Sequence, residues 1–147
     1  MTPGFELKNS LLDEHGVQTV DLGPEAADPV GYPEMAAKLA TALKQGRAQP
    51  GVMVCGSGMD IAIAANRYPW LCAAMCHDVT TARLAREHND ANVLALGARL
   101  IGLGVARDRL LTFLDTPFAR AATHAAWPRC RPHRKPDPAA FLGVQCP

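Results

Sequence analysis

The sequence predicts an α/β protein built on a doubly wound parallel sheet. Short apolar runs alternate with helix-like segments of about ten residues, which is the pattern of repeated βαβ units. One of these runs leads directly into a glycine-rich turn and a further helix, as strands of this class commonly do. The chain has 147 residues, of which 48% are hydrophobic, so it can bury one sizeable core.

The amino-terminal part is expected to form two helices separated by a strand. The helix predicted at 5–15 has leucines at helical spacing, and a short strand is expected at 17–22. A loop at 25–31 leads to a second helix at 33–45. This helix begins with a proline, which suits a first turn, and a glycine follows it.

The next part alternates strand and helix three times. The expected strands are 51–55, 71–76 and 93–96, and the expected helices are 58–66, 78–89 and 105–114. Asp78 is a side chain of the type that caps a helix. Ligands of such sheets bind at the carboxyl ends of the strands, so the strand ends at Cys55, Cys76 and Leu96-Gly97 are candidate positions for a site.

Residues 128–147 differ from the rest of the chain, because they are rich in proline and carry four basic residues against one acidic residue. This composition is typical of a solvated, flexible tail. We therefore expect one domain over residues 1–127 and a flexible tail over 128–147, with a contact to a partner subunit's anion site as the alternative.

Charge and cysteine content exclude several function classes. The net charge of +1 gives no reason to expect nucleic-acid or membrane binding, and no apolar run approaches a membrane span. The five cysteines are odd in number and lack CxxC spacing, which argues against a disulfide framework or a zinc site. The amino terminus has no signal-peptide layout, so we expect a cytoplasmic protein without a metal or cofactor.

The turn Gly56-Ser57-Gly58 joins the strand ending at Cys55 to a helix. Glycines let a backbone approach a ligand closely, and the free N–H groups there favour negative charge. A thiol at this position can serve as a base or nucleophile. A plain tight corner and a structural cysteine are the alternatives, since both are common.

His88 and Asn89 stand at the end of the helix predicted at 78–89. A histidine there is often only a helix cap. In the simplest topology this helix end lies away from the carboxyl edge of the sheet, so it does not reach Cys55 in one subunit. A site shared across a dimer removes the difficulty.

Two long motifs resemble the ribose-5-phosphate isomerase B family and the related galactose-6-phosphate isomerase subunits. They are CGSGMDIAIAANR at 55–67 and CHDVTTARLAREHNDANVLALGARLIG at 76–102. GFELK at 4–8 and the Tyr32-Pro33 pair fit the same pattern, and the resemblance covers about residues 4–118.

The resemblance implies a homodimeric, metal-free aldose–ketose isomerase with a flavodoxin-like three-layer fold and a site shared between subunits. The reaction would interconvert ribose 5-phosphate and ribulose 5-phosphate through an enediolate. The implied catalytic residues are Cys55 as the base, Ser57 as an aid to proton transfer, and His88 from the other subunit. The implied substrate-binding residues are Gly56, Gly58, Asn89, Arg99 and Tyr32.

The sequence departs from the family pattern at three places. The family begins with a strand ending in Ser-Asp-His-Ala-Gly-Phe, which lies between two others in a 2-1-3-4-5 sheet. Here the chain starts Met-Thr-Pro-Gly-Phe, so we expect that strand to be missing. Asp60 stands at a usual glycine. A late Arg-His…Arg phosphate clamp is not matched around 123–127.

These observations favour an active sugar-phosphate isomerase. The substrate could also be another phosphorylated aldose or an unphosphorylated sugar. The alternative is a catalytically impaired relative that binds a sugar phosphate or pairs with a partner. A redox protein using Cys55 is the third reading, and no resolving cysteine is spaced to support it.

Overall fold

The computed structural model of the chain describes residues 3–13, 17–24, 30–47, 49–119 and 140–145. The helices are α1 Pro3–Leu12, α2 Tyr32–Lys44, α3 Met59–Ala65, α4 Val79–Asn89 and α5 Leu103–Asp115. The strands are β1 Gln18–Asp21, β2 Gly51–Cys55, β3 Ala73–Met75, β4 Val93–Gly97 and β5 Ala140–Gln145. The predicted elements through α5 are all present, with ends that differ by at most three residues.

The five strands form one sheet in the order β1-β5-β2-β4-β3, and all neighbouring pairs are parallel. The doubly wound parallel class is therefore confirmed. The order differs from the expected one, in which the strand at 71–76 would lie between those at 51–55 and 93–96. Instead β4 pairs with β2, and β3 lies at the edge. Every residue of β4 is buried, whereas the three residues of β3 are only half-buried, which suits β3 to the edge.

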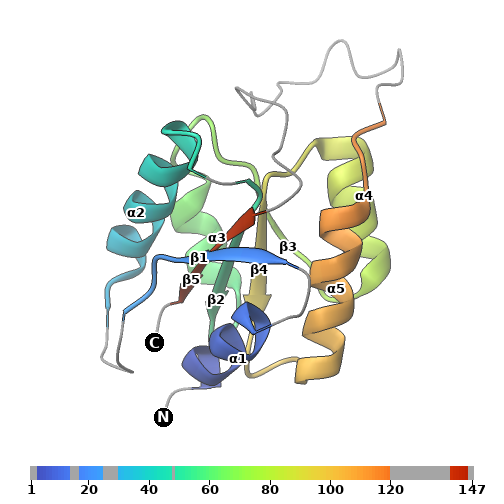
Figure 1. The fold of residues 1–147 in the computed structure, drawn as a ribbon, viewed down its shortest axis with the longest axis horizontal. Helices are drawn as coiled ribbons and strands as arrows, with labels where there is room; N and C mark the ends of the chain where they lie inside the picture. The colour runs from blue at the N-terminus through green and yellow to red at the C-terminus, as the bar shows by residue number, and fades with distance from the viewer. Residues whose placement is uncertain (1–2, 14–16, 25–29, 48, 120–139, 146–147) are drawn as a thin grey trace.

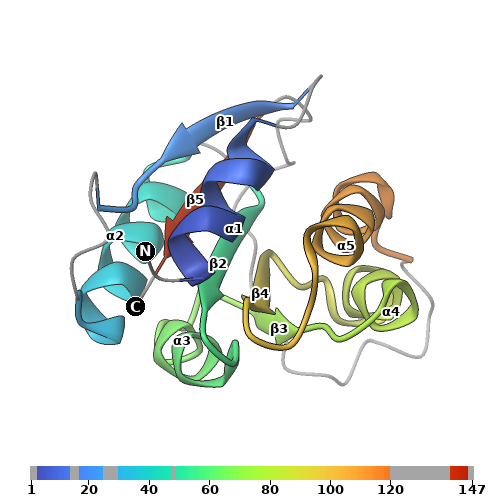
Figure 2. The ribbon, with the colours of Figure 1, turned by 90° about the horizontal axis from the view of Figure 1, so that it is seen from below.

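Helices cover both faces of the sheet (Figures 1 and 2). Alternate residues of β2 point to opposite sides, as the pleat requires. Met53 and Cys55 pack in the core cluster with α2 and α3. Val52 and Val54 pack in the cluster with α1, α4 and α5. The result is a three-layer sandwich with the side chain of Cys55 on the α2 and α3 side.

The flexible tail predicted over 128–147 is wrong for residues 140–145, which form β5 in the interior of the sheet. Residues 128–139, 146 and 147 lie outside the described residues. Among the described residues, which begin with α1, β1 is the first strand, and β5 occupies the position between β1 and β2. The physical reason is that an interior strand leaves neither neighbour with a bare edge, which favours filling this position.

The capping prediction for Asp78 is confirmed. Its side chain accepts a hydrogen bond of 2.7 Å from the Thr81 N–H, and the Thr81 hydroxyl oxygen accepts one from the Asp78 N–H. The pKa of Asp78 is lowered, chiefly because that backbone N–H stabilises its charged form. This reciprocal cap fixes where α4 leaves the carboxyl edge of β3.

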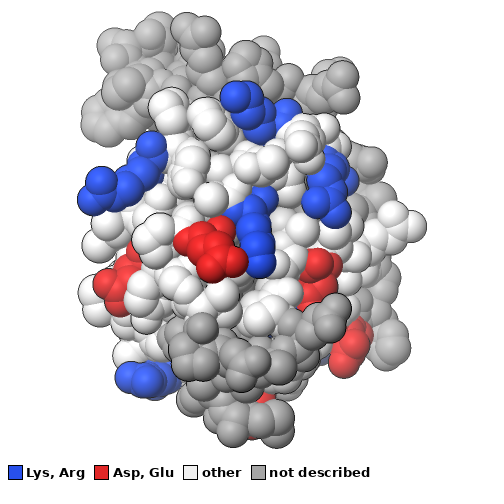
Figure 3. All heavy atoms as spheres, turned by 90° about the vertical axis from the view of Figure 1, so that its left-hand side faces the viewer, with Lys and Arg blue, Asp and Glu red and all other residues white. Residues whose placement is uncertain are grey.

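Two further observations concern membrane crossing and surface charge. None of the described helices is long and apolar enough to cross a membrane. On the face that includes α2, the described acidic and basic side chains are interspersed rather than gathered by sign (Figure 3).

Candidate active site

Cys55 is the last residue of β2, and its side chain is fully buried. The N–H of Gly58 donates a hydrogen bond of 3.0 Å to its Sγ. Gly58 has a φ of +83°, a conformation that glycine adopts without strain. The turn after β2 is thus folded back over the sulfur, and a substrate can reach Sγ only if covering atoms move.

The glycine turn is fastened directly onto the carboxyl end of β4. The N–H of Ala98 donates to the carbonyl of Cys55 at 2.8 Å, and the N–H of Arg99 donates to that of Gly56 at 3.0 Å. A Cβ on Gly97 would lie 2.5 Å from the carbonyl oxygen of Ser57, so the two backbones touch here. The parallel register of β2 and β4 therefore continues into the site.

Two polar side chains border this turn. The hydroxyl of Ser57 accepts a hydrogen bond of 3.2 Å from the N–H of Met59 and is half-buried. Arg99 is exposed, and its Nε lies 3.3 Å from the position that a Cβ on Gly56 would take. The structure therefore brings Cys55, Gly56, Ser57, Gly58 and Arg99 together at the carboxyl edge of the sheet, where the sequence analysis expected a site.

Tyr32 lies at the same edge of the sheet. It is the first residue of α2, the helix that follows β1, and its half-buried side chain packs against the core shared by α2 and α3. Helices that follow parallel strands begin at the carboxyl edge. Tyr32 is therefore on the site's side of the molecule.

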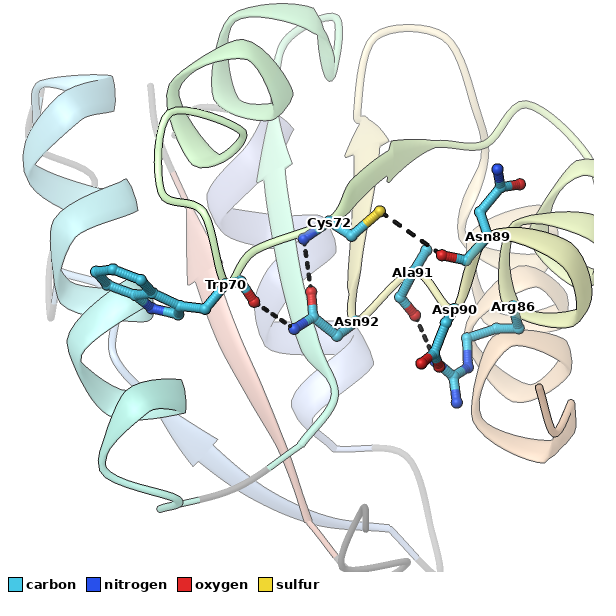
Figure 4. A network of polar contacts seen from close by, with 7 residues as sticks. All are labelled: Trp70, Cys72, Arg86, Asn89, Asp90, Ala91 and Asn92. Atoms are coloured by element: carbon cyan, nitrogen blue, oxygen red, sulfur yellow. Dashed lines mark hydrogen bonds and ion pairs between the residues drawn. The ribbon is translucent and has the colours of Figure 1, made fainter. Parts of the chain in front are cut away.

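His88 and Asn89 lie at the opposite edge of the sheet. They end α4, and both side chains are exposed. The thiol of Cys72 donates to the Asn89 carbonyl at 4.0 Å, close to where the chain enters β4 (Figure 4). One copy of the chain thus does not bring His88 to Cys55, as the topology predicted.

Asn92 organises this opposite edge, and the sequence analysis did not single it out. Its Oδ1 accepts from the Cys72 N–H at 2.7 Å, and its Nδ2 donates to the Trp70 carbonyl at 2.8 Å (Figure 4). Nearby, Arg86 donates to Asp90 at 3.3 Å and to the carbonyl of Ala91 at 2.5 Å. The second asparagine of the NDAN run, just before a buried strand, was the available signal.

His77 and Arg109 were not singled out as site residues either, and Cys76 was named only as a strand end. His77 is exposed and lies two residues after the end of β3. Its neighbour Cys76 is buried, and burial raises the pKa of its thiol to about 11, so it stays neutral at pH 7. Arg109 of α5 is buried, and its Nε and Nη1 have no hydrogen-bond partner among the described residues. An arginine within a predicted helix gives no sign in the sequence that its side chain is buried.

A sequence model of the family described as Ribose/Galactose Isomerase matches residues 2–127. This chain belongs to the ribose/galactose isomerase family. Ribose-5-phosphate isomerase B of Escherichia coli (strain K12) is 39% identical over 107 residues, covering 71% of this chain and 72% of that protein. D-erythrulose-4-phosphate isomerase of Pectobacterium atrosepticum is 39% identical over 119 residues, covering 78% of each.

Solved structures agree with this membership. The ribose 5-phosphate isomerase of Thermotoga maritima superposes with a TM-score of 0.78 at 40% identity, covering 82% of this chain and 85% of that one. A Mycoplasma genitalium ribose-5-phosphate isomerase B with bound ribulose-5-phosphate gives 0.73 at 31% identity, covering 81% and 82%. This ribose/galactose isomerase family member therefore shares its fold, as well as its sequence motifs, with ribose-5-phosphate isomerases.

Proposed function

We propose that this family member interconverts ribose 5-phosphate and ribulose 5-phosphate, with Cys55 as the catalytic base. The observation that carries the proposal is the turn after β2. In this turn the N–H of Gly58 donates to the sulfur of Cys55, and the guanidinium of Arg99 lies against Gly56. Membership of a sugar isomerase family supplies the reaction class.

The chemistry divides among these groups. The thiolate of Cys55 takes the proton from C2 of the open-chain aldose and returns it to C1 of the enediolate. The hydroxyl of Ser57 passes a proton between the oxygens on C1 and C2. Backbone N–H groups of the glycine turn stabilise the oxyanion as it develops. Arg99 offers a fork of donors that suits a phosphate.

Tyr32 is proposed to contact the sugar from the start of α2. His88 and Asn89 are proposed to come from a second copy of the chain, with His88 assisting ring opening and Asn89 contacting the sugar. This assignment is supported by their exposure and by their distance in the fold from the glycine turn.

A pairing surface is available for such a dimer. Six large apolar side chains are exposed by about half, and five of them lie within three residues of the start of α3, α4 or α5, at the carboxyl edge of the sheet. They are Met59, Ile63, Val79, Leu100, Leu103 and Val105. Apolar side chains grouped in this way are typical of a protein interface. This surface borders the glycine turn, so a partner seated on it would approach the site.

Asp60 favours a second candidate, in which the substrate is another phosphorylated aldose or turnover is low. It is exposed in the first turn of α3, five residues after Cys55. A carboxylate there adds negative charge near an enediolate. The similarity to a D-erythrulose-4-phosphate isomerase supports a different sugar within the same reaction class.

The proposal is tested by assaying aldose–ketose conversion with ribose 5-phosphate and with shorter and longer aldose phosphates. We expect turnover that falls at least about 100-fold in Cys55→Ala, because the base is lost. Cys72→Ala is the matched control, since Cys72 lies at the opposite edge, and it should retain activity. Turnover that survives Cys55→Ala contradicts the mechanism, and no turnover of any sugar phosphate by the parent chain contradicts the function.

A further inference from the structure

The position between β1 and β2 is the one place in the sheet that is filled from the far end of the chain. β5 pairs with β1 from Gln18↔Ala140 to Asp21↔Gly143. It pairs with β2 from Gly51↔Leu142 to Val54↔Gln145. Among the described strands, β1 has no other neighbour. β5 therefore joins β1 to the rest of the sheet and reaches the residue that precedes Cys55.

The backbone of β2 requires a partner on this side. The N–H of Gly51 donates to the carbonyl of Asn92, and the carbonyl of Cys55 accepts from Ala98, so residues 51 and 55 face β4. Backbone groups alternate in direction along a strand, and those of Val52 and Val54 therefore face β5. Both residues are 1% exposed with β5 in place, and without β5 these backbone groups would lose their partners and lie at a bare edge of the sheet.

The path of the chain allows this return. The N–H of Ala119 donates to the carbonyl of Glu87 at 2.9 Å, which holds the end of the α5 segment near the amino edge of the sheet. β5 begins at that same edge, since it runs parallel to β2. Twenty intervening residues can span up to about 70 Å, and crossing a few strands about 5 Å apart requires far less.

The handedness of the connections is also consistent. Crossovers that run toward β3 carry their helices, α2 and α3, on one face of the sheet. Crossovers that run toward β1 carry theirs, α4 and α5, on the other face. This is the arrangement in which every crossover has the same hand, as parallel sheets require. The connection from β4 through α5 to β5 obeys it.

We infer that the carboxy-terminal segment Ala140–Gln145 is an obligatory interior strand, and that the geometry of β2 and of the turn after Cys55 depends on it. The part of this inference that concerns activity rests on the proposed function. The part that concerns the backbone does not. The segment Ala140–Gln145 is thus a structural component of the site.

Amide hydrogen exchange of the full chain, followed by NMR, tests the inference without any substitution. The N–H groups of Val52 and Val54 should be protected to the same degree as that of Met53, which faces β4. Exchange of Val52 and Val54 at the rate of an exposed edge strand, with Met53 protected, would overturn the inference.

Variants extend the test. Val144→Pro removes a backbone N–H that faces β2, between the register partners of Val52 and Val54, and should speed exchange at both residues by about 100-fold or more. A chain ending at residue 139 should do the same or fail to fold. A chain ending at Gln145, which keeps β5, is the matched control and should exchange like the parent. Unchanged exchange in both altered chains would overturn the inference.

Activity separates this inference from the proposed function. Loss of turnover in the chain ending at residue 139, with turnover kept in the chain ending at Gln145, supports the dependence of the site on β5. Full turnover in the chain ending at residue 139 overturns that dependence and leaves the function standing. An inactive parent with protected Val52 and Val54 contradicts only the function.

Discussion

At the scale of single residues, the site depends on glycines that permit close contact between two segments of backbone. Gly97 ends β4, and a Cβ there would lie 2.5 Å from the carbonyl oxygen of Ser57 and 2.6 Å from its carbonyl carbon. Neither atom belongs to a flexible side chain that could rotate away. The position of the turn after Cys55 is therefore coupled to the absence of a side chain at residue 97.

Gly97→Ala should destabilise the protein by about 1–3 kcal/mol, because the backbone must shift to admit the methyl group. The same shift should move the turn and lower kcat. Gly104→Ala is the matched control, since a Cβ there meets nothing within 4 Å and lies in a helix. It should be neutral or stabilise by up to about 1 kcal/mol. Urea unfolding and the isomerase assay measure both effects, and equal stability of the two variants would contradict the prediction.

The thiol of Cys76 makes stability depend on pH in the alkaline range. Burial raises its pKa from 9.0 to about 11 in the folded protein, so folding favours the neutral thiol. The stabilising contribution is full below pH 9 and is lost as the pH rises toward 11. We expect the free energy of unfolding to fall by about 1–2 kcal/mol more in the parent than in Cys76→Ala over this range. Parallel pH profiles for the two proteins would contradict this.

At the scale of elements, two asparagines make the same kind of bridge in different surroundings. Asn92 is 5% exposed and joins the backbone of Trp70 and Cys72. Asn66 is exposed and forms two equivalent bonds with the backbone of Ala73, at 2.8 and 2.9 Å. The pair separates the effect of burial from the effect of hydrogen bonding.

Asn92→Ala should destabilise the fold by about 2–4 kcal/mol, because it removes a buried side chain and leaves the part-buried Cys72 N–H and Trp70 carbonyl without the partner that it supplies. Asn66→Ala should cost less than about 1 kcal/mol, because water replaces the lost bonds. Thermal unfolding of both variants measures the difference. A cost for Asn66→Ala as large as that for Asn92→Ala would show that burial does not decide the effect.

The elements also show what the sequence could and could not predict. Strands and helices through α5 were predictable because their apolar spacing and caps are local properties. The pairing of β4 with β2 was not, because it depends on how completely each strand is buried. β5 was missed because the proline-rich, basic residues before it dominate the composition, although Ala140 to Val144 is an unbroken apolar run with a central glycine. A segment-by-segment search for strands buried on both faces would have found it.

At the scale of the whole molecule, the candidate residues fall on two edges of one sheet. Local motifs were sufficient to place Cys55, Ser57 and Arg99 at the same edge of the sheet, because all three lie at the carboxyl ends of parallel strands, and the pairing of β2 with β4 then brings them together. No local motif specifies which surface meets His88. A reaction that uses both Cys55 and His88 therefore requires a second copy of the chain. The exposed apolar side chains that include Met59 and Leu103 offer a surface on which that copy can pack.

Mixed dimers test the shared site. Cys55→Ala and His88→Ala should each be nearly inactive alone. Equal amounts of the two variants are mixed, dissociated and reassociated, so that half of the dimers contain one chain of each kind. In such a mixed dimer, one of the two sites has both an intact Cys55 and an intact His88. Activity should therefore return to about a quarter of the parent value per site. Mixing Cys55→Ala with Ser57→Ala, whose defects lie in the same half-site, is the control and should restore nothing. Complementation that is absent from the first mixture, with mixed dimers verified by mass, would place the whole reaction within one chain.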